Sequence, residues 1–132
     1  MSVLFESAGK LIWDPSPRVA SMFQHHVRAL EEMLAIRSGV GEVANDECEI
    51  DEVQLRLFLQ VVAAEIERTS NPILVNLVGG CFAIAAGLLH VCDPDQALML
   101  QGTSAVLQRH GIDMIAGREN VGALPFASAA GS

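Results

Sequence analysis

The segment from Asn71 to Cys92 constrains the fold of this chain more than any other. Between Pro72 and Cys92 there is no ionised side chain, and Asn76 and His90 are the only strongly polar residues. An asparagine followed by a proline is a typical helix start, so we expect one helix over residues 72–92. Because such a helix is apolar on every side, it must be surrounded by other helices of a soluble domain or by lipid.

Five residues of this helix share one face because they recur at spacings of four, three, four and three. All five are small or polar, so we predict a shallow groove that accepts either a closely packed helix or a ligand. Close packing is the favoured interpretation, because each interior glycine costs up to ~1 kcal/mol relative to alanine and needs compensation. The residues of this predicted groove are Asn76, Gly80, Ala83, Gly87 and His90.

A membrane span is the alternative for residues 72–92, because about 20 apolar residues are enough to cross a bilayer. The mean hydropathy of the chain, +0.36, is also high for a soluble protein. The flanks favour a buried helix of a soluble domain, since they carry neither an excess of Lys and Arg on one side nor a belt of Trp and Tyr. A single-span membrane protein is therefore the weaker alternative, and no membrane partner is favoured.

The composition favours a single domain that associates with copies of itself. A chain of 132 residues can bury about two-thirds of its unfolded surface. Hydrophobic residues make up 51% and charged residues only 18%, which indicates more buried or subunit-facing area than a typical soluble domain has. We therefore expect a homo-oligomer.

The charge balance argues against a nucleic-acid partner. Eight Lys and Arg stand against sixteen Asp and Glu, and the arginines are scattered instead of clustered. Many of the acids fall in residues 41–50, where we predict a solvated loop that could receive a basic surface of another protein. The residues of this predicted acidic partner surface are Glu42, Asp46, Glu47 and Glu49.

The remaining segments predict a mainly α fold: a compact four-helix domain with the apolar helix at its centre. Apolar periodicity and capping residues place the other helices at residues 17–37, 51–69 and 94–110. The short apolar runs in residues 1–14 predict a small N-terminal β-hairpin. We also expect a short extended segment at Ile112–Ile115. Together these elements predict one helical domain over residues 1–116, followed by a small-residue tail over 117–132.

No catalytic motif is present, so we do not expect an enzyme or a cofactor. The chain contains neither HExxH nor a Glu-x-x-His pair of the kind that di-iron bundles use. His90, Cys92 and Asp93 could bind a metal only if a turn at the helix end brought them together, and His90 is better explained as stabilising the helix C-terminus. Three cysteines without a CxxC pair indicate reduced thiols and a cytoplasmic location.

These observations favour a non-enzymatic protein that acts through protein–protein contacts. We expect a self-associating helical adaptor, an assembly subunit or a regulator, with itself and another protein as partners. The alternative is a helical domain that binds a small ligand or a metal in the groove of the 72–92 helix. The features that support the first hypothesis are the excess of apolar residues, the acidic loop and the absence of a motif.

Overall fold

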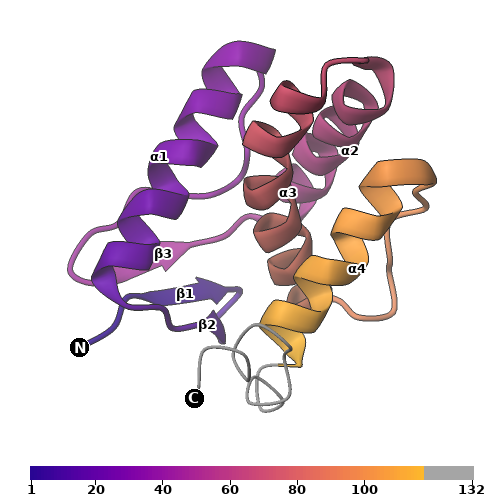
Figure 1. Ribbon diagram of the computed structural model, residues 1–132. Coiled ribbons are helices and arrows are strands. Elements are labelled where there is room, and N and C mark those ends of the chain that lie inside the picture. The colour runs from indigo at the N-terminus through magenta and orange to yellow at the C-terminus, as the bar shows by residue number, and fades with distance from the viewer. Residues whose placement is uncertain (118–132) are drawn as a thin grey trace, which may run out of the picture.

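Four helices and a small sheet make up residues 1–117, the part of the chain that the computed structural model describes (Figure 1). The predicted fold class, mainly α with an N-terminal hairpin, is confirmed. Except for Gly117, the predicted tail lies outside the described residues. The elements in chain order are β1 (Leu4–Ser7), β2 (Lys10–Trp13), α1 (Pro17–Leu34), β3 (Glu47–Glu49), α2 (Glu52–Arg68), α3 (Pro72–Cys92) and α4 (Gly102–Ala116).

The N-terminal hairpin has a third strand beside it. β1 and β2 pair in antiparallel fashion around a turn at Ala8 and Gly9, whose φ angles are 51° and 81°. β3 pairs with β1 in parallel, and the strand order is β2-β1-β3. The prediction of a loop over residues 41–50 is therefore wrong for Glu47–Glu49. Because the parallel partner of β3 comes from a distant part of the chain, no hairpin turn next to β3 in the sequence indicates that it is a strand.

An aromatic cluster joins the hairpin to α1. The ring centroids of Phe5 and Trp13 are 5.0 Å apart, and those of Trp13 and Phe23 are 5.5 Å apart in an edge-to-face arrangement. Phe5 is fully buried, whereas Trp13 and Phe23 keep a small exposed fraction. Pairs of this geometry contribute about 0.5–1.5 kcal/mol beyond their buried area. The cluster therefore fixes how α1 lies on the sheet.

The predicted starts of the first three helices are confirmed because each has a local capping side chain. Ser16, Asp51 and Asn71 each accept a hydrogen bond from a backbone N–H two or three residues further on. The end of α1 differs from the predicted position 37. Ala35 adopts a left-handed conformation with φ of 55° and ends the helix at Leu34.

The last helix begins eight residues later than predicted, and continues six residues further. Asp93 caps the C-terminus of α3 through its backbone N–H, so it is not available as the cap of a helix over 94–110. The N-terminus of α4 is capped instead by α2, because the Glu67 carboxylate accepts a hydrogen bond from the Ser104 N–H at 2.7 Å. Gly111 lies inside the helix rather than ending it, and Ile112–Ile115 is helical rather than extended.

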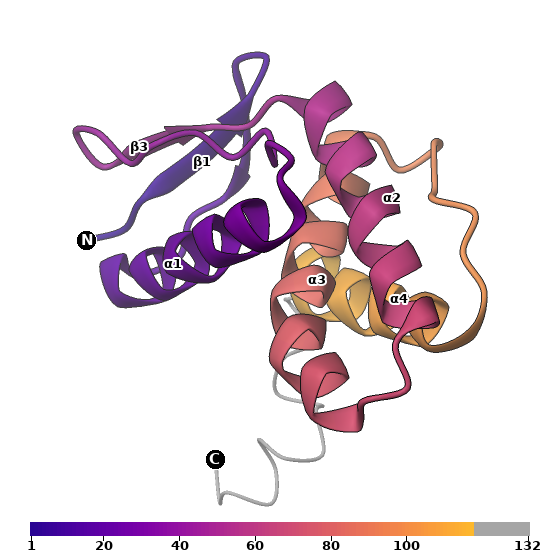
Figure 2. The same cartoon turned by 90° about the horizontal axis from the view of Figure 1, so that it is seen from above.

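α3 lies between α1 on one side and the pair formed by α2 and α4 on the other (Figures 1 and 2). Its length and composition would allow it to cross a membrane, but 56% of its most apolar window is buried by the rest of the chain. The crossing with α4 is very close, since a Cβ atom built on Gly87 would collide with the Gly111 carbonyl oxygen and with Ile115. At Gly87, a small residue of α3 therefore lies directly against the backbone of α4.

Candidate functional site

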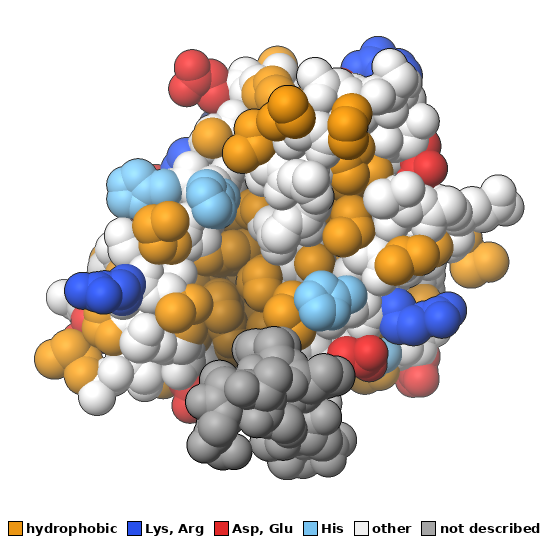
Figure 3. Space-filling model, in the orientation of Figure 1, with side chains coloured by type: hydrophobic (Ala, Val, Ile, Leu, Met, Phe, Trp, Pro, Cys, Tyr) orange, Lys and Arg blue, Asp and Glu red, His pale blue; other side chains and the backbone are white. Residues whose placement is uncertain are grey.

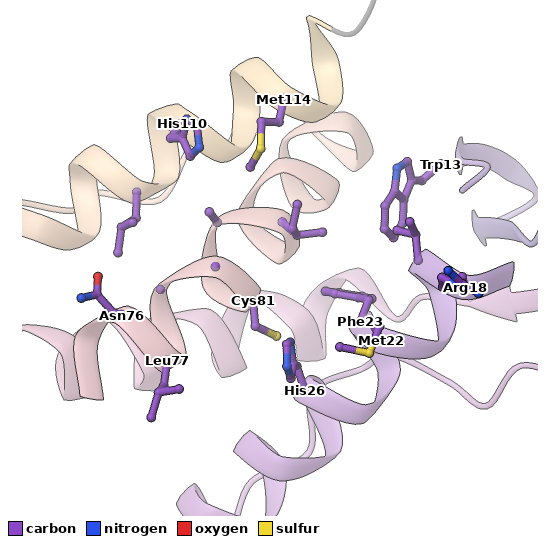
Figure 4. Close-up of a pocket in the computed structure, with 16 residues that line it drawn as sticks. Trp13, Arg18, Met22, Phe23, His26, Asn76, Leu77, Cys81, His110 and Met114 are labelled. Atoms are coloured by element: carbon purple, nitrogen blue, oxygen red, sulfur yellow. The ribbon is translucent and has the colours of Figure 1, made fainter. Parts of the chain in front are cut away.

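An apolar groove with a volume of about 770 Å³ opens on the face formed by α1, α3 and α4 (Figures 3 and 4). α3 forms its floor, α1 one wall and α4 the other, with the Trp13 ring at one end. Its lining residues are Trp13, Arg18, Val19, Met22, Phe23, His26, Asn76, Leu77, Gly79, Gly80, Cys81, Ala83, Ile84, Leu107, His110 and Met114.

The floor of the groove is hollow because α3 carries small residues there. A Cβ atom built on Gly80 would meet no atom within 4 Å, so the space above this residue is open. Ala83, one turn further, is buried beside it. Gly79 lies against Leu107 of α4, whose side chain would be 3.2 Å from an added Cβ. A partner could therefore come close to the α3 backbone at Gly80.

The edges of the groove expose large apolar side chains. Val19 and Met22 of α1 are 47% and 55% exposed, and Leu77 of α3 is 72% exposed. Ile73, one turn before Leu77, is also exposed and extends the apolar surface beyond the groove along α3. Contiguous apolar surface of this kind is rare on monomeric proteins unless it binds something.

Among the described residues, the polar groups of the groove are few, and none of them is acidic. Among the 16 lining residues there is no Asp or Glu, whereas Arg18 and His26 stand on the α1 wall and His110 on the α4 wall. Asn76 adds an amide at the end away from Trp13. A site of this composition has space for an apolar group and offers hydrogen-bond donors at its edges.

The structure brings together three of the five residues of the predicted groove. Asn76, Gly80 and Ala83 line the cavity, whereas Gly87 and His90 do not. Gly87 is covered by α4, because the two helices cross there, and the half-buried His90 lies beyond the crossing. α4 therefore covers the C-terminal part of the predicted face, and the groove lies over its N-terminal part.

The two walls were not predicted as parts of a site, because they depend on helix packing. The sequence places His26 on the apolar side of its helix, beside Met22 and Phe23, where a histidine is more often a core or interface residue than a ligand. In the structure His26 is exposed at the edge of the groove. The signal available in the sequence was a histidine one turn after a methionine on an otherwise apolar helix face.

The acidic residues of the predicted partner surface do not lie in the groove. Glu42 is within 3.4 Å of Arg28, in an exposed ion pair. Asp46 belongs to the turn before β3, where its φ angle is 60°, and Glu47 and Glu49 are exposed on either side of the buried Cys48. These acids form a separate surface beside the sheet.

The cysteine thiols give no sign of nucleophilic chemistry. Burial raises the pKa of the Cys81 thiol, which lines the groove, to about 12. Burial also raises the pKa of Cys48 to about 11. Because the thiolate is the reactive form, both side chains behave as small apolar groups near neutral pH. Residues 1–117 also contain no group of three or more His, Cys, Asp or Glu side chains that could hold a metal.

The comparisons with known proteins identify a family but no characterised relative. No curated protein and no solved structure matches the chain. The model of one family, described as a family of unknown function (DUF6086), matches residues 1–112. This range covers the sheet, α1, α2, α3 and most of α4, and therefore all of the groove except Met114. The chain belongs to the DUF6086 family.

Proposed function

We propose that this chain is a non-enzymatic interaction protein whose groove binds an amphipathic helix of a partner protein. The observation that carries the proposal is the apolar groove between α1 and α4, open above Gly80. Two helical walls and a floor with small side chains are the features of a helix-in-groove site. In this role the chain is an adaptor, an assembly subunit or a regulator, and the cytoplasm remains its expected location.

The dimensions of the groove support a short helical occupant. Its floor extends from Asn76 to Ile84, and its α1 wall from Arg18 to His26. Eight residues of helix rise about 12 Å, so the groove is as long as two to three turns of a bound helix. Such a helix would present two or three apolar side chains to the floor, at positions i, i+3 or i+4, and i+7.

The exposed edges favour a protein over a small molecule. Small-molecule sites enclose most of their ligand, whereas here Leu77 and Met22 are more than half exposed at the edge, and Ile73 lies outside the groove. Only an occupant that extends beyond the groove would remove these side chains from water. Removing this apolar area from water would stabilise the complex by about 25 cal/mol per Å².

A small apolar ligand is the second candidate, because a volume of about 770 Å³ lies within the range of small-molecule sites. A ligand that binds only the folded state raises the melting temperature. Thermal shift with fatty acids and with divalent metals separates this candidate from the first. A stabilising apolar ligand that fills the groove in the absence of a peptide would favour it.

Self-association is a further part of the proposal, and another surface supports it. Val53, Leu57 and Val61 recur every fourth residue on α2 and are 72%, 48% and 37% exposed. This stripe faces away from the residues of α2 that pack in the core, such as Leu55 and Phe58. A second copy of the chain is the partner that we expect on it.

The groove is tested by filling it. Gly80→Leu places a branched side chain in open space, so the fold should be retained while the groove is blocked. Ala29→Leu creates the same side chain at an exposed α1 position that does not line the groove, and serves as the control. The probe is a Trp-free amphipathic peptide with a leucine stripe, followed through the single tryptophan, Trp13, which lines the groove. Binding that Gly80→Leu leaves unchanged would refute the proposal.

A further inference from the structure

We propose that the groove selects an amphipathic helix whose polar edges are acidic. This inference rests on the proposed function and adds the charge of the partner segment. It runs against the net charge of the chain, −8, which by itself would favour a basic partner. The argument depends on how the charges are distributed around the groove.

The groove is electrostatically unlike the rest of the chain. Fifteen of the sixteen Asp and Glu residues lie within the described residues 1–117, and none of these fifteen lines the groove. Arg18 and two of the four histidines, His26 and His110, do line it. Asp14 and Asp113, which are close in sequence to lining residues, are not part of the lining. Among the described residues, the lining therefore offers the guanidinium of Arg18 and imidazole N–H donors, and it contains no carboxylate.

Arg18 and His26 define where acidic side chains of the occupant would lie. The two residues are eight positions apart on α1, which corresponds to about 12 Å along the helix. A bound helix that runs alongside α1 presents residues i and i+7, or i and i+8, at that separation. Carboxylates at these positions would meet Arg18 and His26. The apolar stripe, on the neighbouring face of the bound helix, would then face Gly80.

His110 provides a donor on the opposite wall. It stands on α4 and points toward the groove across from α1 (Figure 4). An acidic side chain on the other edge of the bound helix would meet it. The preferred occupant therefore has acids on both sides of its apolar stripe, whereas a basic residue there would face the like charge of Arg18.

Charges that lie far from the groove act only weakly on its occupant at physiological salt. At 0.15 M ionic strength, exposed charges more than about 8 Å apart are largely screened. The acids at positions 42, 46, 47 and 49 belong to the surface beside the sheet. An arginine guanidinium can also bind a carboxylate through two parallel N–H donors, which makes the short-range contact specific.

The test uses three Trp-free peptides with the same leucine stripe and with Glu, Gln or Lys at the edge positions, titrated at 0.15 M salt and followed by Trp13 fluorescence. We expect the Glu peptide to bind about tenfold more tightly than the Lys peptide, with the Gln peptide between them. Arg18→Gln should weaken the Glu peptide about threefold and leave the Gln peptide unchanged. Arg109→Gln removes the same charge from an exposed α4 position outside the lining, and should change neither.

The outcomes separate this inference from the proposed function. Equal binding of the three peptides, blocked by Gly80→Leu, would overturn the acidic preference and leave the groove as a helix-binding site. Tighter binding of the Lys peptide would overturn it as well. No binding of any of the three would overturn the proposed function itself. An acidic preference that Arg109→Gln reduces as much as Arg18→Gln would assign the effect to net charge and contradict the role of the groove.

Discussion

Gly87 of α3 and Gly111 of α4 lie face to face, so close that neither position has room for a Cβ atom. A Cβ on Gly87 would collide with the Gly111 carbonyl oxygen, and a Cβ on Gly111 with the Ala83 carbonyl oxygen. Because these contacts are with backbone, no side-chain rotation relieves them. This crossing holds α4 against the C-terminal half of α3 and leaves the groove at the N-terminal half.

We predict that Gly87→Ala destabilises the fold by about 1–3 kcal/mol, the usual cost of overpacking a close contact. Gly80→Ala is the matched control on the same helix. Its Cβ meets open space, so the higher helix propensity of alanine should stabilise the fold by up to ~1 kcal/mol. Urea unfolding followed by circular dichroism measures both. Equal effects of the two substitutions would contradict the crossing.

A second prediction concerns the contact between Glu31 and Ser38. The Glu31 carboxylate accepts hydrogen bonds from the Ser38 backbone N–H at 2.9 Å and from its hydroxyl at 2.6 Å, and Ser38 is fully buried. Glu31→Ala should destabilise the fold by about 1–3 kcal/mol, because it leaves a buried N–H without its acceptor. Glu32→Ala, at the exposed neighbouring position, should change the free energy of unfolding far less. A similar loss in both variants would contradict this role.

The pH dependence of stability should follow two carboxylates. Burial tends to raise the pKa of Glu31, but hydrogen bonds from Ser38 and the charge of Arg28 outweigh it and lower the pKa below 4.5. Hydrogen bonds from Ser104 lower the pKa of Glu67 in the same way. Each group therefore adds stability that is fully present above its unfolded pKa and is lost as the pH falls through its folded pKa.

The test of this dependence is the unfolding free energy measured from pH 6 down to pH 3. We expect a decline that begins near pH 4.5 and continues below it. Glu67→Gln should flatten part of the decline, because the variant has no proton to take up at that position. Glu47→Gln, on the exposed strand β3, is the control and should keep the wild-type slope. Identical slopes in both variants would remove Glu67 from the explanation.

Self-association is expected to depend on the exposed stripe of α2. Val53→Glu introduces a charge at a position that is 72% exposed, so the fold should be retained while an apolar contact between copies is lost. Ala29→Glu adds the same charge at an exposed position of α1 and serves as the control. Light scattering over a concentration series should show a lower mass for Val53→Glu alone. A wild-type protein that is monomeric throughout would contradict the predicted homo-oligomer.

The parts of the fold that could be predicted from the sequence are those specified by neighbouring residues. Ser16, Asp51 and Asn71 cap their helices through N–H groups two or three residues away, so the starts of α1, α2 and α3 were predictable. α4 is capped by Glu67, which lies 37 residues before Ser104, and its start could not be predicted from local signals. The parallel strand β3 was missed for the same reason.

In the candidate site, too, the parts set by neighbouring residues could be predicted and the parts set by distant residues could not. Asn76, Gly80 and Ala83 lie on one helix, so their shared face followed from the helical period. Which part of that face stays open depends on where α4 crosses it, and this is decided by the contact at Gly111 rather than by α3 alone. The walls on α1 and α4, with the Arg18, His26 and His110 side chains that they contribute, become visible only once the helices are packed.

The most direct test of the account is the Trp13 fluorescence titration of the wild-type protein and of Gly80→Leu with the acidic amphipathic peptide. We predict saturable binding to the wild type, a loss of at least tenfold in affinity for Gly80→Leu, and unchanged binding for Ala29→Leu, with all three proteins equally folded by circular dichroism. Wild-type affinity in a folded Gly80→Leu variant, or no binding to the wild type, would contradict the claim that the groove binds a helix.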